Sequence, residues 1–232
     1  MKPYYQDDSV TIYNADCRDV LSTIDYVDLV IADPPYNIGY KYDIYKDVLS
    51  EIEYYKFLKT TLSQMPCVLI HYPESVFRFS IEIGIPPEEV VAWVYHSNVW
   101  GKKQWRSLAW FNSKPDFNLG SQEYRNKKDK RIQKRIQQNY KASLSDWWEI
   151  EQVKNNSIEK TNHPCQIPEK LIKRIIQITP GTEVVLDPFM GSGSTLRAAK
   201  DLNKKAIGIE ISEEYCEVAA IRMSQTVMNL EV

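Results

Sequence analysis

The sequence lacks the features that mark several common classes of protein. None of its apolar runs approaches the roughly 18 residues that a membrane-spanning helix needs. Its first ten residues are polar and include two aspartates, so we expect neither a secretory signal nor contact with a membrane. No two cysteines form a CxxC pair, which argues against a structural zinc site, and we predict no bound metal. The four cysteines are scattered, which is typical of a protein in the reducing cytoplasm; they are Cys17, Cys67, Cys165 and Cys216.

The composition is that of a folded domain. Of the 232 residues, 43% are hydrophobic and 26% are charged, which excludes a chain that is disordered throughout. The length suits one domain with an insertion better than two full domains. The sequence contains neither an internal repeat nor a low-complexity tract, so a repeat architecture is not expected.

Short β-rich segments alternate with helical patterns, which predicts an α/β fold. Helical spacing of apolar residues occurs at 168–178, after Gly193 and after Ser212. The predicted strands are at 10–13, 27–32, 67–70, 90–95, 107–111, 184–186 and 206–209. Those at 90–95 and 107–111 are predicted to form a hairpin-like unit. Most of these strands are almost continuously apolar, which favours a parallel sheet that is covered on both faces.

The middle of the chain departs from this alternation. All six tryptophans lie between Trp93 and Trp148, although tryptophan clustering alone identifies no activity. Between Glu123 and Lys141, eight basic residues face only two acidic ones, so this segment carries a net charge of +6 and the remaining chain −8. Such a segment indicates either a polyanionic partner or a solvated surface. We predict that residues 113–160 are an insertion on the sheet scaffold.

One motif whose residue types suit ligand binding is DPFMGSGST at 187–195, directly after a predicted strand. A strand, a glycine turn and a helix form a ligand crevice at the carboxyl end of a sheet. Glu210 follows Asp187 by 23 positions, a spacing that fits a carboxylate binding ribose hydroxyls. The missing third glycine disfavours a dinucleotide, and the acidic residue before the glycines suits a ligand with an amine and a sulfonium. A glycine pair alone is also typical of a simple turn.

The second motif, DPPY at 33–36, directly follows the predicted strand at 27–32 and is the more specific signal. Two prolines fix the backbone and remove two donors, which leaves carbonyls as acceptors. Asp33 adds a carboxylate and Tyr36 adds an aromatic face, so the motif would hold an exocyclic amine and stack on its ring. The alternative is a rigid turn with an ordinary aspartate, which the second motif at another strand end disfavours.

Both motifs resemble those of the S-adenosylmethionine-dependent DNA amino-methyltransferases, which methylate adenine N6 or cytosine N4. The order, with the catalytic motif first and the cofactor loop last, is similar to the β-group of this family. HPCQIP at 163–168 is similar to the family's HPTQKP, but Ile167 replaces a common lysine and leaves the role of this stretch open. The resemblance implies a Rossmann-like α/β methyltransferase with a mostly parallel sheet of roughly seven strands and helices on both faces. A single domain, 1–232, would comprise a catalytic half at 1–112, a target-recognition insertion at about 113–160 and a cofactor-binding half at 161–232.

The resemblance also implies roles for individual residues. Asp33 and the Pro34 carbonyl would accept hydrogen bonds from the target amine, and Tyr36 would stack on the base. The catalytic motif is completed by Pro35. The cofactor would be bound by Asp16 near its adenine, Glu210 on its ribose, and Asp187, Pro188, Phe189, Gly191, Gly193 and Thr195. DNA phosphates would be bound by Lys102, Lys103, Arg106, Lys127, Lys128, Lys130, Arg131, Lys134 and Arg135.

The function that the resemblance implies is site-specific transfer of a methyl group from S-adenosylmethionine to adenine N6 in double-stranded DNA. An aspartate before Pro-Pro-Tyr favours adenine, because serine is commoner there in cytosine enzymes. Methylation of cytosine N4, of RNA or of a protein glutamine stays open, as does a catalytically silent DNA-binding subunit. A nicotinamide dehydrogenase is disfavoured. The implied source is a prokaryote or phage, with a homodimer and a cognate restriction nuclease as open partners.

Overall fold

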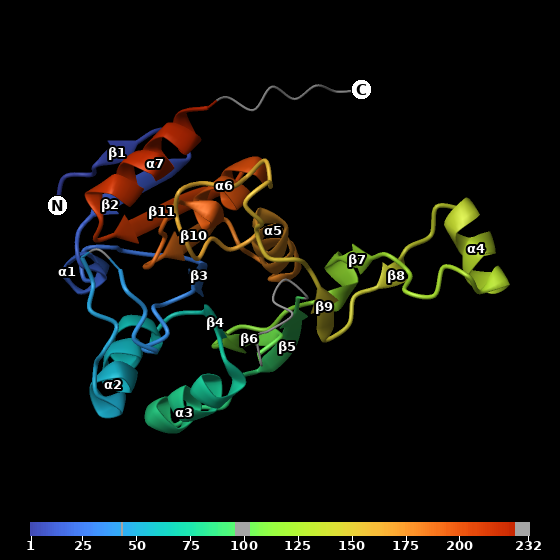
Figure 1. Cartoon of the computed structure of the whole chain (residues 1–232), viewed down its shortest axis with the longest axis horizontal. Coiled ribbons are helices and arrows are strands. Elements are labelled where there is room, and N and C mark those ends of the chain that lie inside the picture. The colour runs from blue at the N-terminus through green and yellow to red at the C-terminus, as the bar shows by residue number, and fades with distance from the viewer. Residues whose placement is uncertain (43, 96–102, 226–232) are drawn as a thin grey trace.

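One mixed sheet runs through the computed structural model, which describes residues 1–42, 44–95 and 103–225 (Figure 1). Within these residues its strand order is β1-β2-β11-β10-β3-β4-β6-β5-β9. The strands are β1 (Tyr5–Gln6), β2 (Val10–Asn14), β3 (Leu29–Ala32), β4 (Cys67–His71), β5 (Glu89–Val94), β6 (Trp105–Phe111), β9 (Trp147–Glu149), β10 (Val184–Asp187) and β11 (Lys205–Glu210). Pairing is antiparallel only where β1 meets β2 and where β6 meets β4 and β5.

The mostly parallel sheet is confirmed, but its nine described strands exceed the seven that the sequence predicts. The two extra strands, β1 and β9, lie at the two edges and contain only two and three residues. Segments this short carry too little alternation to be recognised as strands from their sequence.

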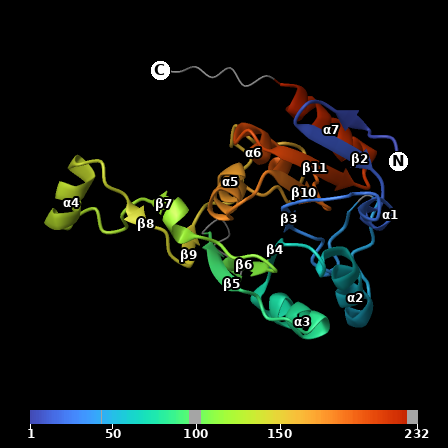
Figure 2. The same cartoon turned by 180° about the vertical axis from the view of Figure 1, so that it is seen from behind.

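Helices cover both faces of the sheet, as Figures 1 and 2 show. Alternate residues of β3 explain this arrangement, because successive strand side chains point to opposite faces. Leu29 and Ile31 pack in one core cluster, and Val30 and Ala32 pack in the other. The first cluster lies under α5 (Glu169–Ile178), α6 (Ser194–Asp201) and α7 (Glu213–Ser224), and the second under α1 (Cys17–Leu21), α2 (Glu51–Leu62) and α3 (Pro73–Ile83).

The topology reverses between β3 and β10. From β3 the chain passes through α2 to β4, whereas from β10 it passes through α6 to β11 on the other side. Since β3 and β10 are parallel neighbours, with Val30 opposite Leu186, their carboxyl ends lie side by side. Ligands of open α/β sheets bind at such a switch point. Asp33 and Asp187 therefore come together here.

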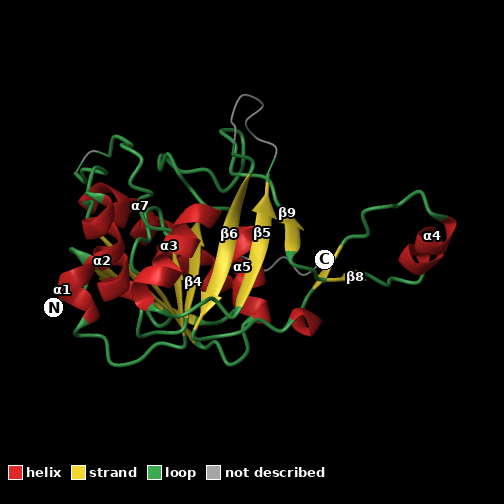
Figure 3. Ribbon diagram, turned by 90° about the horizontal axis from the view of Figure 1, so that it is seen from below, coloured by secondary structure: helices red, strands yellow, loops and turns green. Residues whose placement is uncertain are grey.

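A projecting segment, which we call the basic arm (residues 123–141), stands apart from the body of the protein (Figure 3). A short ribbon of β7 (Ser121–Gln122) and β8 (Ala142–Ser143) follows the 3₁₀ helix Phe117–Leu119 and leads to α4 (Lys130–Gln137). No residue of α4 is buried. After the basic arm the chain returns to the main sheet, where β9 pairs with β5 and Trp148 is buried.

We predict that the basic arm contributes little to the stability of the fold. Replacing residues 123–141 with an Asn-Gly turn would join β7 directly to β8 as a tight hairpin. Because α4 buries no side chain and Arg125 makes only an exposed contact with Trp147 of β9, we expect the free energy of unfolding to fall by no more than about 1 kcal/mol. Urea denaturation followed by circular dichroism measures this change, and a decrease of several kcal/mol would show that the basic arm belongs to the folded core.

Candidate active site

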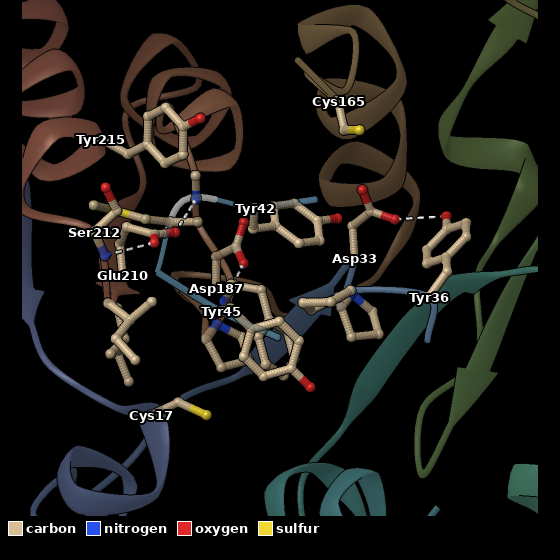
Figure 4. Close-up of a pocket in the computed structure, with 18 of the residues that line it drawn as sticks. Cys17, Asp33, Tyr36, Tyr42, Tyr45, Cys165, Asp187, Glu210, Ser212 and Tyr215 are labelled. Atoms are coloured by element: carbon tan, nitrogen blue, oxygen red, sulfur yellow. Dashed lines mark hydrogen bonds between the residues drawn. The ribbon is translucent and has the colours of Figure 1, made fainter. Parts of the chain in front are cut away.

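A cavity of about 470 Å³ opens at the carboxyl ends of β3 and β10 (Figure 4). It is lined by residues 33–36 from one loop and by residues 187–192 from the other. Asp16 and Glu210 also line the cavity. Its size is within the range of small-molecule sites. The two motifs thus share one cleft.

Asp33 and Tyr36 are joined within their own loop. The Tyr36 hydroxyl donates a hydrogen bond of 2.7 Å to Oδ1 of Asp33, which Figure 4 shows. Burial raises the pKa of Asp33 to about 6, although the nearby charge of Arg106 and the bond from Tyr36 lower it. Asp33 is therefore ionised at neutral pH, and its Oδ2 atom stays available as an acceptor.

A chain of buried hydrogen bonds fixes the loop of residues 33–36, which we call the catalytic loop after its predicted role. Burial lowers the pKa of His71 to about 3, so its ring is neutral. The Tyr72 N–H donates to Nδ1 of His71 (2.8 Å), which leaves Nε2 to donate to the Tyr54 hydroxyl (2.8 Å). Tyr54 in turn donates to the Pro35 carbonyl (2.7 Å). The Pro35 carbonyl is thus occupied, whereas within the described chain no donor reaches the carbonyl of Pro34.

His71 and Tyr54 escaped the sequence analysis. They come from the end of β4 and from α2, and neither belongs to a recognisable motif. The ring of His71 also stacks on that of Tyr36, with a centroid distance of 4.2 Å and an interplanar angle of 19°. The one signal in the sequence that could have pointed to His71 is a histidine at the end of an apolar strand.

On the other side of the cavity, carboxylates organise the glycine loop. Asp187 accepts hydrogen bonds from the Phe189 N–H (3.0 Å) and from the Thr195 side chain. Glu210 accepts from the Gly191 N–H (3.0 Å) and from the N–H of Ser212 (2.9 Å). Burial raises the pKa of Glu210 and raises that of Asp187 to about 7.

The charge of the carboxylates that line the cavity indicates which kind of ligand it fits. Asp33, Asp187 and Glu210 all line it, and each has a raised pKa because its charged form is poorly solvated. A ligand that brings positive charge would stabilise all three ionised forms. An ammonium and a sulfonium on one ligand meet this requirement, so the residues present fit S-adenosylmethionine.

The two glycines of this loop serve the backbone and its packing. Gly191 and Gly193 have φ angles of +49° and +79°, which other residues rarely adopt. A Cβ atom on Gly191 would lie 2.8 Å from Nε2 of His163, and one on Gly193 would lie 3.0 Å from the Cβ of Ala219. Gly193 is also absent from the cavity wall, whereas the other predicted cofactor residues line it. The backbone conformation of Gly193 and its contact with Ala219 therefore account for glycine at this position.

The remaining predicted cofactor residues have local partners. Asp16 caps α1 and pairs with Arg18 at 2.5 Å. Phe189 meets the ring of Phe57 edge-on at 5.8 Å. Ile167, where the family often has lysine, is buried in the core cluster beneath α5 and also lines the cavity. This position therefore offers an apolar contact in place of a charge.

The predicted DNA-binding residues fall in three different places. Arg106 lines the cavity, although the sequence suggested a position on a phosphate-binding surface. Lys103 is exposed, pairs with Glu74 and lies 3.8 Å from the ring centroid of Tyr72. Lys102 lies outside the described residues. The basic arm carries the others, all exposed: Lys127, Lys128, Lys130, Arg131, Lys134 and Arg135.

Arg106 reaches the cavity because β6 runs antiparallel to β4. The first residues of β6 therefore lie at the edge where β3 and β4 end, and Ser107 pairs with His71. The antiparallel pairing of 90–95 with 107–111, which the sequence predicts, is confirmed in β5 and β6. The sequence does not show that β6 also pairs with β4, so the place of Arg106 beside the cavity could not be inferred from the motifs.

A cleft with these two loops at the switch point of an open α/β sheet defines a Rossmann-like methyltransferase. A family model described as "DNA methylase", N6_N4_Mtase, matches residues 27–221. The chain therefore belongs to the N6/N4 DNA methylase family. It is a DNA methyltransferase, and its cofactor is S-adenosylmethionine, as the resemblance implied.

Individual relatives agree with this assignment. M.ScaI, a type II methyltransferase of Streptomyces caespitosus, is 29% identical over 99% of this chain and 86% of its own length. M.BglII of Bacillus subtilis, also a type II methyltransferase, is 31% identical over 90% of this chain and 67% of its own. The DNA adenine methyltransferase YhdJ of Escherichia coli K12 is 30% identical over 94% of this chain and 84% of its own.

Solved structures share the fold. The M1.HpyAVI complex with S-adenosylmethionine has a TM-score of 0.62 and 23% identity, and the match covers 93% of this chain and all of that one. The cytosine-N4-specific PvuII DNA methyltransferase has a TM-score of 0.70 and 18% identity, with 98% and 90% of the two chains covered.

We predict that Tyr54→Phe impairs catalysis without weakening binding at the glycine loop. The change removes the hydroxyl that bridges His71 and Pro35, and leaving buried polar groups unpaired costs about 1–3 kcal/mol of stability. The loosened loop would lower methyl-transfer turnover roughly ten- to a hundredfold. Affinity for S-adenosylhomocysteine, measured by calorimetry, would stay unchanged.

Tyr55→Phe is the matched control, because it removes the same atom from the neighbouring buried ring outside this hydrogen-bond chain. Equal turnover in the Tyr54→Phe and Tyr55→Phe variants would contradict a positioning role for Tyr54.

Proposed function

We propose that this chain methylates the N6 amine of adenine at specific sites in double-stranded DNA. The observation that carries the proposal is the one cavity that Asp33 and Pro34 line together with the carboxylates of Asp187 and Glu210. The Asp-Pro-Pro-Tyr motif and the similarity to a DNA adenine methyltransferase support adenine.

The proposed chemistry begins with a poor nucleophile, since the lone pair of an exocyclic amine is delocalised into the ring. S-adenosylmethionine supplies the electrophilic methyl group. Oδ2 of Asp33 and the Pro34 carbonyl accept hydrogen bonds from the two N–H groups of the amine. These hydrogen bonds draw the amine nitrogen toward tetrahedral geometry. Positive charge develops on the amine as the methyl group is transferred, and the fixed Asp33 carboxylate stabilises that charge. With its pKa near 6, Asp33 is also suited to take up the proton that the methylated amine releases.

The target amine is inaccessible inside a duplex, so the base must leave the helix at a cost of a few kcal/mol. Stacking on the ring of Tyr36 would offset about 1–3 kcal/mol of that cost. His71 holds this ring from one side at 4.2 Å, which restricts its motion before the base arrives. The proposal also includes binding of the cofactor by Asp16, Pro188, Phe189 and Glu210.

Cytosine N4 is the second candidate, because the amines of the two bases present similar geometry to Asp33. The PvuII enzyme, which shares this fold, is cytosine-N4-specific. With cytosine as the target, Asp33 would keep its role and the cavity would hold a smaller ring.

Partners and location complete the proposal. The type II names of the relatives support a restriction-modification setting, so a cognate nuclease stays a prediction, as does a homodimer. Of the helices in the described chain, none combines the length and apolarity needed to cross a bilayer. The four cysteines are unpaired, which supports the cytoplasm.

We predict that DNA from cells expressing the chain contains N6-methyladenine at one short sequence. Nucleoside mass spectrometry identifies the modified base, and sequencing maps its positions. Asp33→Asn should lower turnover about 10²–10³-fold, because the charge that stabilises the transition state is removed. Its affinity for S-adenosylhomocysteine, whose sulfur is neutral, should be retained. N4-methylcytosine would establish the second candidate, and the absence of any methylated base would refute the proposed function.

We also predict that the basic arm binds DNA phosphates. Changing four of its cations to glutamine should reduce the salt dependence of DNA binding, and the slope should fall by about 0.9 for each phosphate that is no longer neutralised. The four are Lys127, Lys128, Lys130 and Arg131. Fluorescence anisotropy at several salt concentrations measures the slope.

The control changes Lys204 and Lys205 to glutamine. These lysines lie at the amino end of β11, whereas the cavity lies at the carboxyl ends of the strands. An unchanged slope in the basic-arm variant would make that segment a solvated surface.

A further inference from the structure

The proposed function leaves Arg106 without a role. Its guanidinium lies 5.0 Å from the ring centroid of Tyr36 and 5.4 Å and 5.6 Å from those of Trp93 and Tyr95. Its Nε atom is buried and has no hydrogen-bond partner among the residues that the structure describes. The guanidinium does hydrogen-bond to the Tyr95 side chain, so Nε is the donor left without a partner. An arginine that only stabilised the fold would be expected to have this buried donor satisfied as well.

The position of Arg106 conflicts with base stacking. His71 stacks on Tyr36 at 4.2 Å and nearly parallel, so it fills one face of that ring. The guanidinium of Arg106 lies over the same ring and can therefore occupy only the other face. That face is the one on which a flipped base would stack. A guanidinium and a nucleobase are both flat and both favour an aromatic face, so they compete for this place.

The charge of Arg106 also fits the free enzyme better than the reacting complex. Before DNA binds, its positive charge balances the buried carboxylate of Asp33, whose ionised form it favours. During the reaction, positive charge develops on the target amine, and a second cation over Tyr36 would oppose it. The arginine is therefore compatible with the resting cavity and unfavourable in the transition state.

We infer that Arg106 is a stand-in for the target base: it covers the stacking face of Tyr36 in the free enzyme and moves to a DNA phosphate when the base enters. This inference rests on the proposed function and adds to it a residue that couples base entry to backbone binding. The new phosphate contact would give the buried Nε donor of Arg106 an acceptor and supply attraction that partly offsets the cost of base flipping. Arg106 is half-buried and lines the cavity, so its side chain is open to solvent on one side.

The test compares two duplexes that carry the mapped recognition sequence. One has the intact target base, and the other has an abasic site there, so nothing displaces Arg106. For each duplex, anisotropy gives the dependence of affinity on salt concentration, with the enzyme saturated with S-adenosylhomocysteine. We expect Arg106→Gln to lower the slope by about 0.9 on the intact duplex and to leave the slope on the abasic duplex unchanged.

Two further variants make the result specific. Arg106→Lys keeps the charge and should restore the slope on the intact duplex. Lys103→Gln removes a neighbouring exposed charge and should change both slopes equally, because Lys103 does not occupy the base site. Arg106→Met, which fills similar space, replaces Arg106→Gln if the glutamine variant does not fold.

An equal change in both slopes for Arg106→Gln, or no change in either, would overturn the inference. That failure is distinct from failure of the proposed function. If wild-type enzyme leaves a methylated base in DNA but the slopes respond equally, only the role of Arg106 is wrong. If wild-type enzyme leaves no methylated base, the proposed function itself is wrong.

Discussion

The active site depends on keeping negative charge buried at the point where the sheet reverses. Asp33, Asp187 and Glu210 lie at the ends of three neighbouring strands and line one cavity. Each ionised carboxylate is costly there, which is why each pKa is raised. Hydrogen bonds from backbone N–H groups hold two of them in place, and the Tyr36 hydroxyl holds the third. The remaining cost makes the site selective for cations, whether they belong to the cofactor, to a methylated amine or to Arg106.

This constraint divides the molecule into a rigid part and an exposed part. The catalytic loop is fixed by a buried chain through His71 and Tyr54, and the glycine loop is fixed by Asp187 and Glu210. The basic arm buries nothing in α4 and stands away from the body. Methyl transfer requires positioning within fractions of an ångström, whereas attraction of a polyanion requires only accessible charge. The separation of the two parts follows from these different demands.

Much of this arrangement could be predicted from the sequence. The apolar strands and the two motifs at strand ends carry strong local signals, and parallel strands bring their carboxyl ends together whatever lies between them. Edge strands β1 and β9 could not be recognised, because two or three residues show no period. The position of Arg106 depends on the pairing of β6, and not β5, with β4, a long-range property that the sequence of the two strands does not reveal. From the sequence, Gly193 is predicted to let a ligand approach the backbone. Its contact with Ala219 is visible only in the folded chain.

The most direct test of the central claim is the pKa of Asp33 with two ligands that differ in charge. Aspartate labelled with carbon-13 at its carboxyl group would report the titration by NMR, with Asp33→Asn assigning the signal. We expect a pKa near 6 in the free protein, a clear decrease with S-adenosylmethionine, and a smaller effect with neutral S-adenosylhomocysteine. An Asp33 pKa that is the same with both ligands would mean that the carboxylate and the sulfonium do not share a cavity.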